Sequence, residues 1–137
     1  MRPALLRAYR DTHYEVAGIE IRVGRRCPAM DLLLLSHRVH TGVFITAYNP
    51  FSRLMPHRWN QRMQVRLQQA VRQRPALPAR GSLGRWGEAH LLVLGDPRPI
   101  RKLARYYRQY GIVIVRRGQP AWLELISQAG LSGGFPT

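Results

Sequence analysis

Arginines recur at helical spacing in two segments of the chain, and this spacing could create a surface for anions. One segment carries Arg98, Arg101, Arg105 and Arg108. In a helix these positions would form a single ridge about 15 Å long, comparable to several phosphate steps of a nucleic acid. The other segment carries a stripe of Arg58, Arg62 and Arg66. The two rows predict contacts to phosphates with little sequence selectivity, although they could equally be the solvated face of an arginine-rich protein.

The overall charge also favours a polyanionic partner. The 137 residues include 22 Lys and Arg against 7 Asp and Glu, which gives a formal net charge of +15 at pH 7. Such a surface attracts nucleic acid over a Debye length. Because Lys102 is the only lysine, the excess of arginine could instead reflect codon bias in a GC-rich genome.

Glu88 is the carboxylate of greatest chemical interest. Most of the other acids lie within the first 31 positions or, like Asp96, precede a predicted helix. Glu88 could form an ion pair with Arg62, or it could act as a general base with a shifted pKa. No second carboxylate is placed to support glycosidase chemistry.

Other motifs of known chemistry find no support. His37 and His40 share a helical spacing, but no acidic or thiol ligand follows at metal-site spacing, so no metal site is predicted. The glycines at 81, 84 and 87 lack the strand-to-helix setting of a dinucleotide loop. Ser36 has no nucleophile elbow. We therefore predict no cofactor, and whether the protein is an enzyme stays open.

Composition indicates one folded domain in a reducing compartment. Hydrophobic residues make up 45% of the chain, enough for a core. Cys27 is the only cysteine, which excludes an intrachain disulfide. The longest wholly apolar run, residues 32–35, is far too short to cross a bilayer. We expect a cytoplasmic protein without a membrane span, and its oligomeric state is not predicted.

The hydrophobic periods predict alternating helices and strands. Helical patterns cover residues 5–13, 28–35, 56–74 and 97–110, and strand patterns cover residues 14–16, 19–23, 43–48, 91–94, 112–115 and 121–126. Residues 75–87 are rich in proline and glycine, so we expect a loop with at most a short edge strand. This order predicts a single α+β domain over residues 1–126, with about four helices packed on a mixed, mainly antiparallel sheet. Residues 127–137 should form a loose tail.

Three stretches of the sequence together resemble one family of short bacterial proteins. They are TAYNPFS at 46–52 followed by Asn60, WGE at 86–88 before LLVLG at 91–95, and RYYRQ at 105–109 before the strand at 112–115. In this order they are similar to the signature of domain of unknown function 3293. The resemblance extends from about residue 5 to residue 125. It implies no particular activity.

The resemblance places a set of polar residues at strand ends and nearby turns. This polar set consists of Thr46, Asn49, Ser52, Asn60, Glu88 and Gln109. If the strands of Thr46 and Leu91 are neighbours, these side chains could converge on a small ligand. They could also be structural, since Asn before Pro commonly forms a turn and Gln109 can satisfy a helix end.

Two functions remain in view from the sequence. The first is a non-catalytic binding module whose arginine rows bind nucleic acid or another polyanion through its phosphates. The alternative is a small-molecule-binding protein or enzyme that uses a polar pocket around Asn49 and Glu88. The two differ in whether the polar set shares one cavity.

Overall fold

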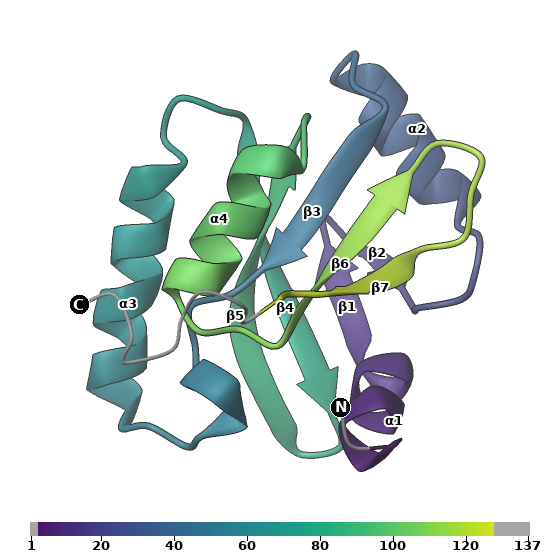
Figure 1. Ribbon diagram of the computed structural model, residues 1–137. Helices are drawn as coiled ribbons and strands as arrows, with labels where there is room; N and C mark the ends of the chain where they lie inside the picture. The colour runs from purple at the N-terminus through teal and green to yellow at the C-terminus, as the bar shows by residue number, and fades with distance from the viewer. Residues whose placement is uncertain (1–2, 128–137) are drawn as a thin grey trace.

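The fold is a curled antiparallel sheet with helices on both faces (Figure 1). The computed structural model describes residues 3–127. Along the chain the elements are α1 (Pro3–Asp11), β1 (His13–Val16), β2 (Ile19–Ile21), α2 (Pro28–Ser36), β3 (Thr41–Ile45), the 3-10 turn η1 (Pro50–Ser52), α3 (His57–Ala70), β4 (Ala76–Leu83), β5 (Trp86–Leu94), α4 (Arg98–Tyr106), β6 (Gly111–Arg116) and β7 (Trp122–Leu125). The predicted α+β class is confirmed.

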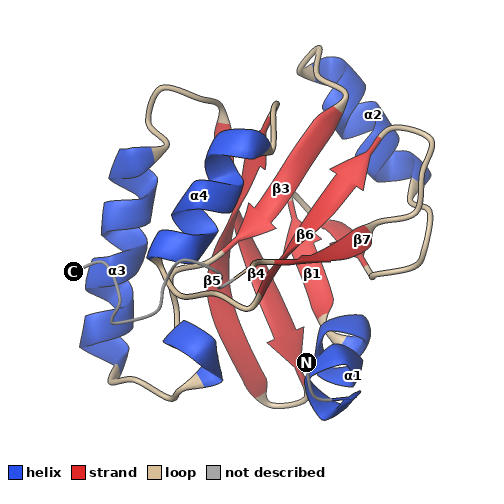
Figure 2. Ribbon diagram, viewed as in Figure 1, coloured by secondary structure: helices blue, strands red, loops and turns tan. Residues whose placement is uncertain are grey.

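The seven strands form one sheet in the order β2-β1-β4-β5-β3-β6-β7. Every pairing within the described residues is antiparallel, so the sheet is more regular than the mixed one expected from the sequence. Figure 2 shows these strands in red, with α3 and α4 side by side on one face of the sheet. The predicted tail lies mostly at 128–137, outside the described residues.

The expectation of a loop at residues 75–87 was wrong, because β4 is an eight-residue strand inside the sheet. It pairs with β5 along its whole length and with β1 from Ala79 to Ser82. Pro78 lies just beyond the end of β1, so its missing N–H costs no ladder bond on that side. Gly84, with φ of 60°, and Arg85 form the tight turn into β5.

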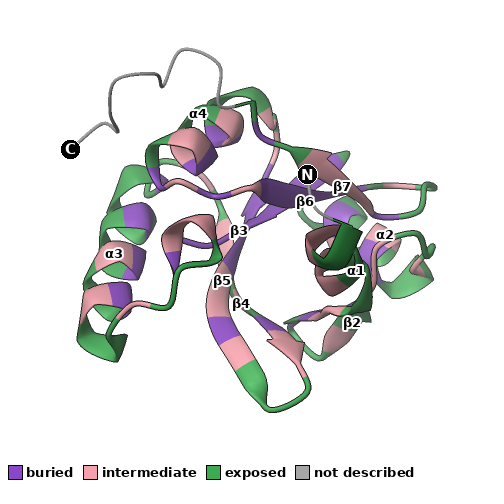
Figure 3. Ribbon diagram, turned by 60° about the horizontal axis from the view of Figure 1, so that its bottom comes forward, coloured by how far each residue is buried: buried purple, intermediate pink, exposed green. Residues whose placement is uncertain are grey.

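Successive side chains of each strand face opposite sides of the sheet, which divides the core in two. In β3, Val43 and Ile45 join the outer core beneath α3 and α4, whereas Phe44 joins the inner core with Tyr14 and Val113. In Figure 3 the sheet curls around its inner side, and α1 lies at the rim. The inner face therefore gathers side chains from strands that are distant in the sequence.

Helices α3 and α4 are shorter than their sequence patterns. α3 ends at Ala70 and α4 at Tyr106, whereas the periodic patterns extended to residues 74 and 110. On the apolar faces of these two segments, Leu67, Ile100 and Tyr107 are buried. Three more, Trp59, Met63 and Leu103, are half-buried, and Ala70 is exposed.

Candidate functional site

A cavity of about 90 Å³ lies on the inner face of the sheet beneath α1. We call it the inner cavity. Its walls come from α1, from β1, β3, β4, β5 and β6, and from the loops that follow β3 and α4. The strand residues that face it alternate, as Glu88 and His90 do in β5. A void of this size can hold several water molecules or a small organic ligand.

The loop after β3 enters the cavity wall through a strained backbone. Asn49, Phe51 and Ser52 have φ values of 46°, 51° and 60°, in the left-handed region that non-glycine residues seldom adopt. The loop is held to the end of α4, because Phe51 N–H donates to the Arg108 carbonyl over 2.6 Å. Strain of this kind persists only where the surroundings fix it, and it concentrates at functional sites.

Asn49 is fixed by a network of amide hydrogen bonds. Its Oδ1 accepts from the backbone N–H of Met55 and from Nδ2 of Asn60, each over 2.9 Å. Its own N–H donates to Asn60 Oδ1 over 3.0 Å. These contacts leave its side-chain Nδ2 facing β5, where it donates to Glu88 Oε1 over 3.3 Å. Asn60 therefore positions Asn49 from behind the cavity wall.

Glu88 is a buried carboxyl in the cavity wall, with 8% of its surface exposed. Burial raises its pKa from 4.5 to about 7, and the hydrogen bond from Asn49 opposes that rise only in part. The ion pair with Arg62 that the sequence suggested is not formed: no ion pair within residues 3–127 involves Glu88. Near neutral pH both the carboxylic acid and the carboxylate are populated.

His90 follows Glu88 by two residues and lines the same cavity. Its Nδ1 lies 3.2 Å from the Glu88 carbonyl oxygen, and its ring packs edge-on against Tyr14. A carbonyl can only accept, so Nδ1 carries the proton and Nε2 is left as an acceptor. Burial lowers the pKa of His90 to about 4, which keeps the imidazole neutral at pH 7.

The remaining members of the polar set have mainly structural contacts at the cavity wall. Thr46 Oγ1 donates to the Ala89 carbonyl over 2.7 Å and accepts from the N–H of Tyr48 over 3.0 Å. Gln109 Nε2 donates to the carbonyls of Tyr48 and Tyr107 over 2.9 and 3.2 Å. The structure thus brings five of the six together, Thr46, Asn49, Ser52, Glu88 and Gln109, with Asn60 behind them.

Among the cavity residues that sequence reasoning missed are Tyr9, Tyr14 and His90. The Tyr9 phenol lies against the backbone of Gly111, and burial raises the pKa of both tyrosines above its usual range. His90 could have been found, since residues two apart on a strand share a face and Glu88 was already singled out. Nothing in the sequence indicated that α1 and β1 would line the same cavity as β3, β5 and β6.

Comparison with protein families gives one match. The model of a family described as Protein of unknown function (DUF3293) matches residues 45–112. The chain belongs to the DUF3293 family. The matched segment contains the strained loop, Asn60, Glu88 and Gln109, whereas Tyr9 and Tyr14 lie before it. No curated protein and no solved structure matches this DUF3293 chain.

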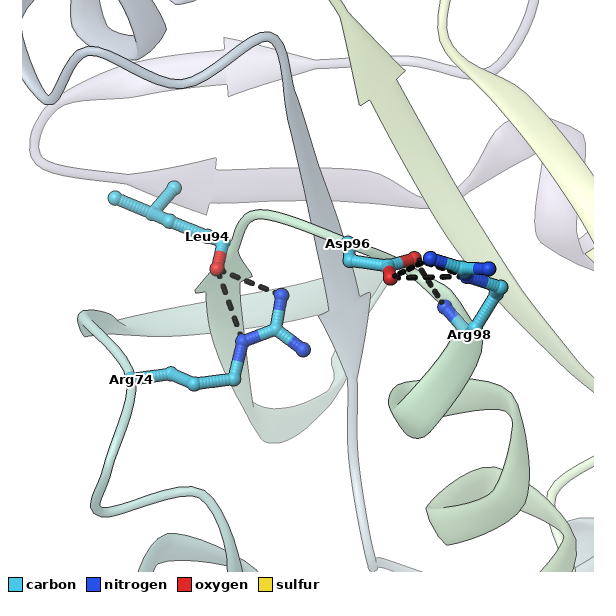
Figure 4. A network of polar contacts seen from close by, with 4 residues as sticks. All are labelled: Arg74, Leu94, Asp96 and Arg98. Carbon is cyan, nitrogen blue, oxygen red and sulfur yellow. Dashed lines mark hydrogen bonds and ion pairs between the residues drawn. The ribbon is translucent and has the colours of Figure 1, made fainter.

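The expected arginine ridge on α4 is largely paired in this DUF3293 protein. Arg98 forms an ion pair with Asp96, which also accepts from the Arg98 N–H over 2.9 Å (Figure 4). Arg101 pairs with Glu124 of β7 through two hydrogen bonds. Arg105 Nε donates to the Ser127 carbonyl over 3.0 Å. Because α4 ends at Tyr106, Arg108 lies beyond the helix, and four free guanidinium groups in one row do not form.

The second row is more accessible. Arg58, Arg62 and Arg66 are exposed on α3, and within the described residues no ion pair includes them. Figure 3 shows exposed segments along the outer side of α3, away from the sheet. This row therefore remains available to an anion.

Within residues 3–127, no three His, Cys, Asp or Glu side chains come together as metal ligands would. None of the helices there has the length and apolarity that crossing a membrane requires.

Proposed function

We propose that this DUF3293 protein binds a small molecule in the inner cavity, and that Glu88 exchanges a proton with the ligand. The observation that supports this most directly is the setting of Glu88. Its carboxyl is buried at the cavity wall, it accepts a hydrogen bond from the neutral amide of Asn49, and its pKa lies at about 7.

A carboxyl with a purely structural role would be expected to have a stronger partner. Burying an ionisable group is costly unless it is paired, and this chain carries 22 basic residues that could supply a cation. None of those within residues 3–127 lines the inner cavity. A ligand that pairs with the carboxyl of Glu88 would offset the free-energy cost of burying it.

The same site would also suit acid–base catalysis. A general acid or base is most effective when its pKa lies near the working pH, and Glu88 meets that condition. The amide network of Asn49 and Asn60 fixes the carboxyl in position. The catalytic form of the proposal requires that a bound ligand presents an exchangeable proton to Glu88.

Ligand-detected and protein-detected NMR with a library of small fragments would test binding. We expect some fragments to shift the backbone amide signals of Gly81 and Gly111, which line the cavity. Ala8→Leu, which adds bulk to the α1 side of the cavity, should abolish those shifts. A library that leaves these signals unchanged, or shifts that persist in Ala8→Leu, would refute the proposal.

A second candidate function is binding of a polyanion by α3. It is supported by the exposed Arg58, Arg62 and Arg66, and by a groove beside Arg66 that Trp59 and Tyr106 also line. Contacts to phosphates release counterions, so the affinity for an oligonucleotide should fall steeply as salt increases. Stacking on an aromatic ring would tolerate any base.

Fluorescence anisotropy with labelled oligonucleotides would test this second function. The double reversal Arg58→Glu and Arg62→Glu should flatten the salt dependence. Arg25→Glu with Arg26→Glu, an equal charge change in an exposed loop, is the control. Equal effects of the two pairs would show a response to net charge alone and exclude a site on α3.

A further inference from the structure

Three polar side chains of the inner cavity, Gln109, His90 and Glu88, offer a ligand an acceptor. The hydrogens on Gln109 Nε2 are directed at two backbone carbonyls, so Gln109 can offer a ligand only its Oε1. His90 can offer only Nε2, because its Nδ1–H faces the Glu88 carbonyl. Glu88 has a second carboxyl oxygen besides the one that Asn49 contacts. A ligand that satisfies these groups must be rich in donors.

The charge of the cavity wall also favours a ligand with hydrogen-bond donors over an anionic ligand. Glu88 is the only Asp, Glu, Lys or Arg among the described residues that line the cavity, although the chain has a net charge of +15. A phosphate or carboxylate ligand would therefore meet a carboxyl and no cation. Anionic ligands are disfavoured at this site even though the surface as a whole attracts them.

Several aromatic rings also line the cavity. Tyr9, Tyr14, Phe44 and Trp86 all line the cavity, and Trp86 is 47% exposed. The face of an aromatic ring attracts a cation, and the attraction is stronger where the site is desolvated. An ammonium group could thus be stabilised by the rings and by the carboxylate together.

We propose that the ligand of the inner cavity is a small primary amine, bound as its ammonium ion against the carboxylate of Glu88. This inference rests on the proposed function and adds the chemical class of the ligand. An ammonium group has three donors and no acceptor, which matches Glu88, His90 and Gln109. The volume of about 90 Å³ limits the ligand to a few heavy atoms.

Binding of an amine should depend on pH through Glu88. The titratable groups that line the cavity with it are Tyr9 from α1, Tyr14 from β1, Tyr48 from the loop after β3 and His90 from β5. Tyr9 and Tyr14 have raised pKa values and His90 titrates near 4, so these three stay neutral between pH 6 and 8. Arg80 lies against Gly87, on the opposite face of β5 from Glu88. Glu88 is therefore the group that gains charge in this range.

Butylamine, butanol and butyrate form a test series of similar size and different charge. We expect butylamine to bind most tightly at pH 8, measured by NMR titration of the Gly81 and Gly111 amides. A site with a pKa of about 7 is mostly ionised at pH 8 and mostly protonated at pH 6. The affinity for butylamine should thus be about tenfold higher at pH 8 than at pH 6.

Glu88→Gln should remove this pH dependence and weaken the binding of butylamine much more than that of butanol. Glu15→Gln, an equal charge change at an exposed position of β1, should behave like the unaltered protein. The pH dependence of the unaltered protein is decisive by itself if Glu88→Gln fails to fold. Affinity for butylamine that is equal at the two pH values would overturn the amine assignment.

The outcomes separate this inference from the proposed function. Tighter binding of butanol or butyrate than of butylamine at pH 8 would overturn the amine assignment and leave small-molecule binding intact. The same holds if none of the three binds while other fragments occupy the cavity. If no fragment of any charge occupies the cavity, both the inference and the proposed function fail.

Discussion

The side-chain amide of Asn49 donates a hydrogen bond to the carboxyl of Glu88, which lies 39 residues further along the chain. This contact joins the strained loop after β3 to the middle of β5. The backbone strain at Asn49 therefore serves to aim an amide at Glu88, the only carboxyl among the described residues that line the inner cavity. Removing either partner should disturb both the loop and the titration of Glu88.

Asn49→Ala should destabilise the protein by about 1 to 3 kcal/mol, because the N–H of Met55 and the amide of Asn60 would lose their acceptor. Urea unfolding would measure the loss. Asn49→Gly separates the two contributions, since glycine relieves the left-handed backbone but also lacks the amide. If Asn49→Ala, which loses the amide without relieving the backbone, is as stable as the unaltered protein, the hydrogen bonds contribute nothing and the argument from the network is wrong.

Glu88 and His90 should affect stability in opposite directions with pH. The pKa of Glu88 is raised from 4.5 to about 7, so the folded state keeps a proton that the unfolded chain releases, and stability falls as pH rises through this range. The pKa of His90 is lowered from 6.5 to about 4, so stability falls as pH drops through that range. Between about pH 4.5 and 6.5 the two effects oppose each other.

Glu88→Gln should reveal the contribution of His90 to the pH dependence of the unfolding free energy. Relative to the unaltered protein, the variant should gain up to about 3 kcal/mol in unfolding free energy between pH 4.5 and 7.5, the equivalent of the Glu88 shift. Its own stability should rise with pH from 4 to 6.5. Glu15→Gln serves as the control, and a Glu88→Gln difference that is the same at both pH values would contradict the burial argument.

Leu67→Ala should cost about 2 to 5 kcal/mol, because this fully buried side chain of α3 packs in the outer core. Val65→Ala on the same helix is the matched control, since Val65 is 52% exposed and its loss should stay within about 0.5 kcal/mol. Thermal and urea unfolding would measure both. Similar losses for the two variants would show that the faces of α3 are wrongly assigned.

The order of helices and strands could be predicted from the sequence because local periods decide it. The predictions failed where contacts between residues that are distant in the sequence determine the structure. β4 carries Pro78 and Gly81, which locally indicate a loop, yet pairing with β1 and β5 makes it a strand. The pairing of Arg101 with Glu124 likewise depends on the contact between α4 and β7, which no local pattern shows.

The candidate site was predictable in part for the same reason. Asn49 and Glu88 could be singled out through their segments, but their meeting required β3 and β5 to be neighbours. Tyr9 and Tyr14 could not be included, because the curl of the sheet and the position of α1 bring them to the cavity. Such arrangements follow from the packing of the whole fold.

Gly81→Ala should destabilise the protein through a clash with His90. Gly81 lies between Tyr14 of β1 and Glu88 of β5 in the sheet register, and a Cβ atom there would come within 2.8 Å of the His90 ring. His90 is also packed against Tyr14, so its ring has little freedom to move. Overpacking of this kind costs about 1 to 3 kcal/mol.

A double-mutant cycle with His90→Ala tests the origin of that cost. When the imidazole is absent, the added methyl group has room, and Gly81→Ala should become neutral or stabilise the strand by about 0.4 to 1 kcal/mol. The coupling between the two substitutions, measured from unfolding free energies, should then exceed about 0.5 kcal/mol. Additive effects would mean that the backbone of β4 requires glycine at position 81. The contact between Gly81 and His90 would then not be the cause of the destabilisation.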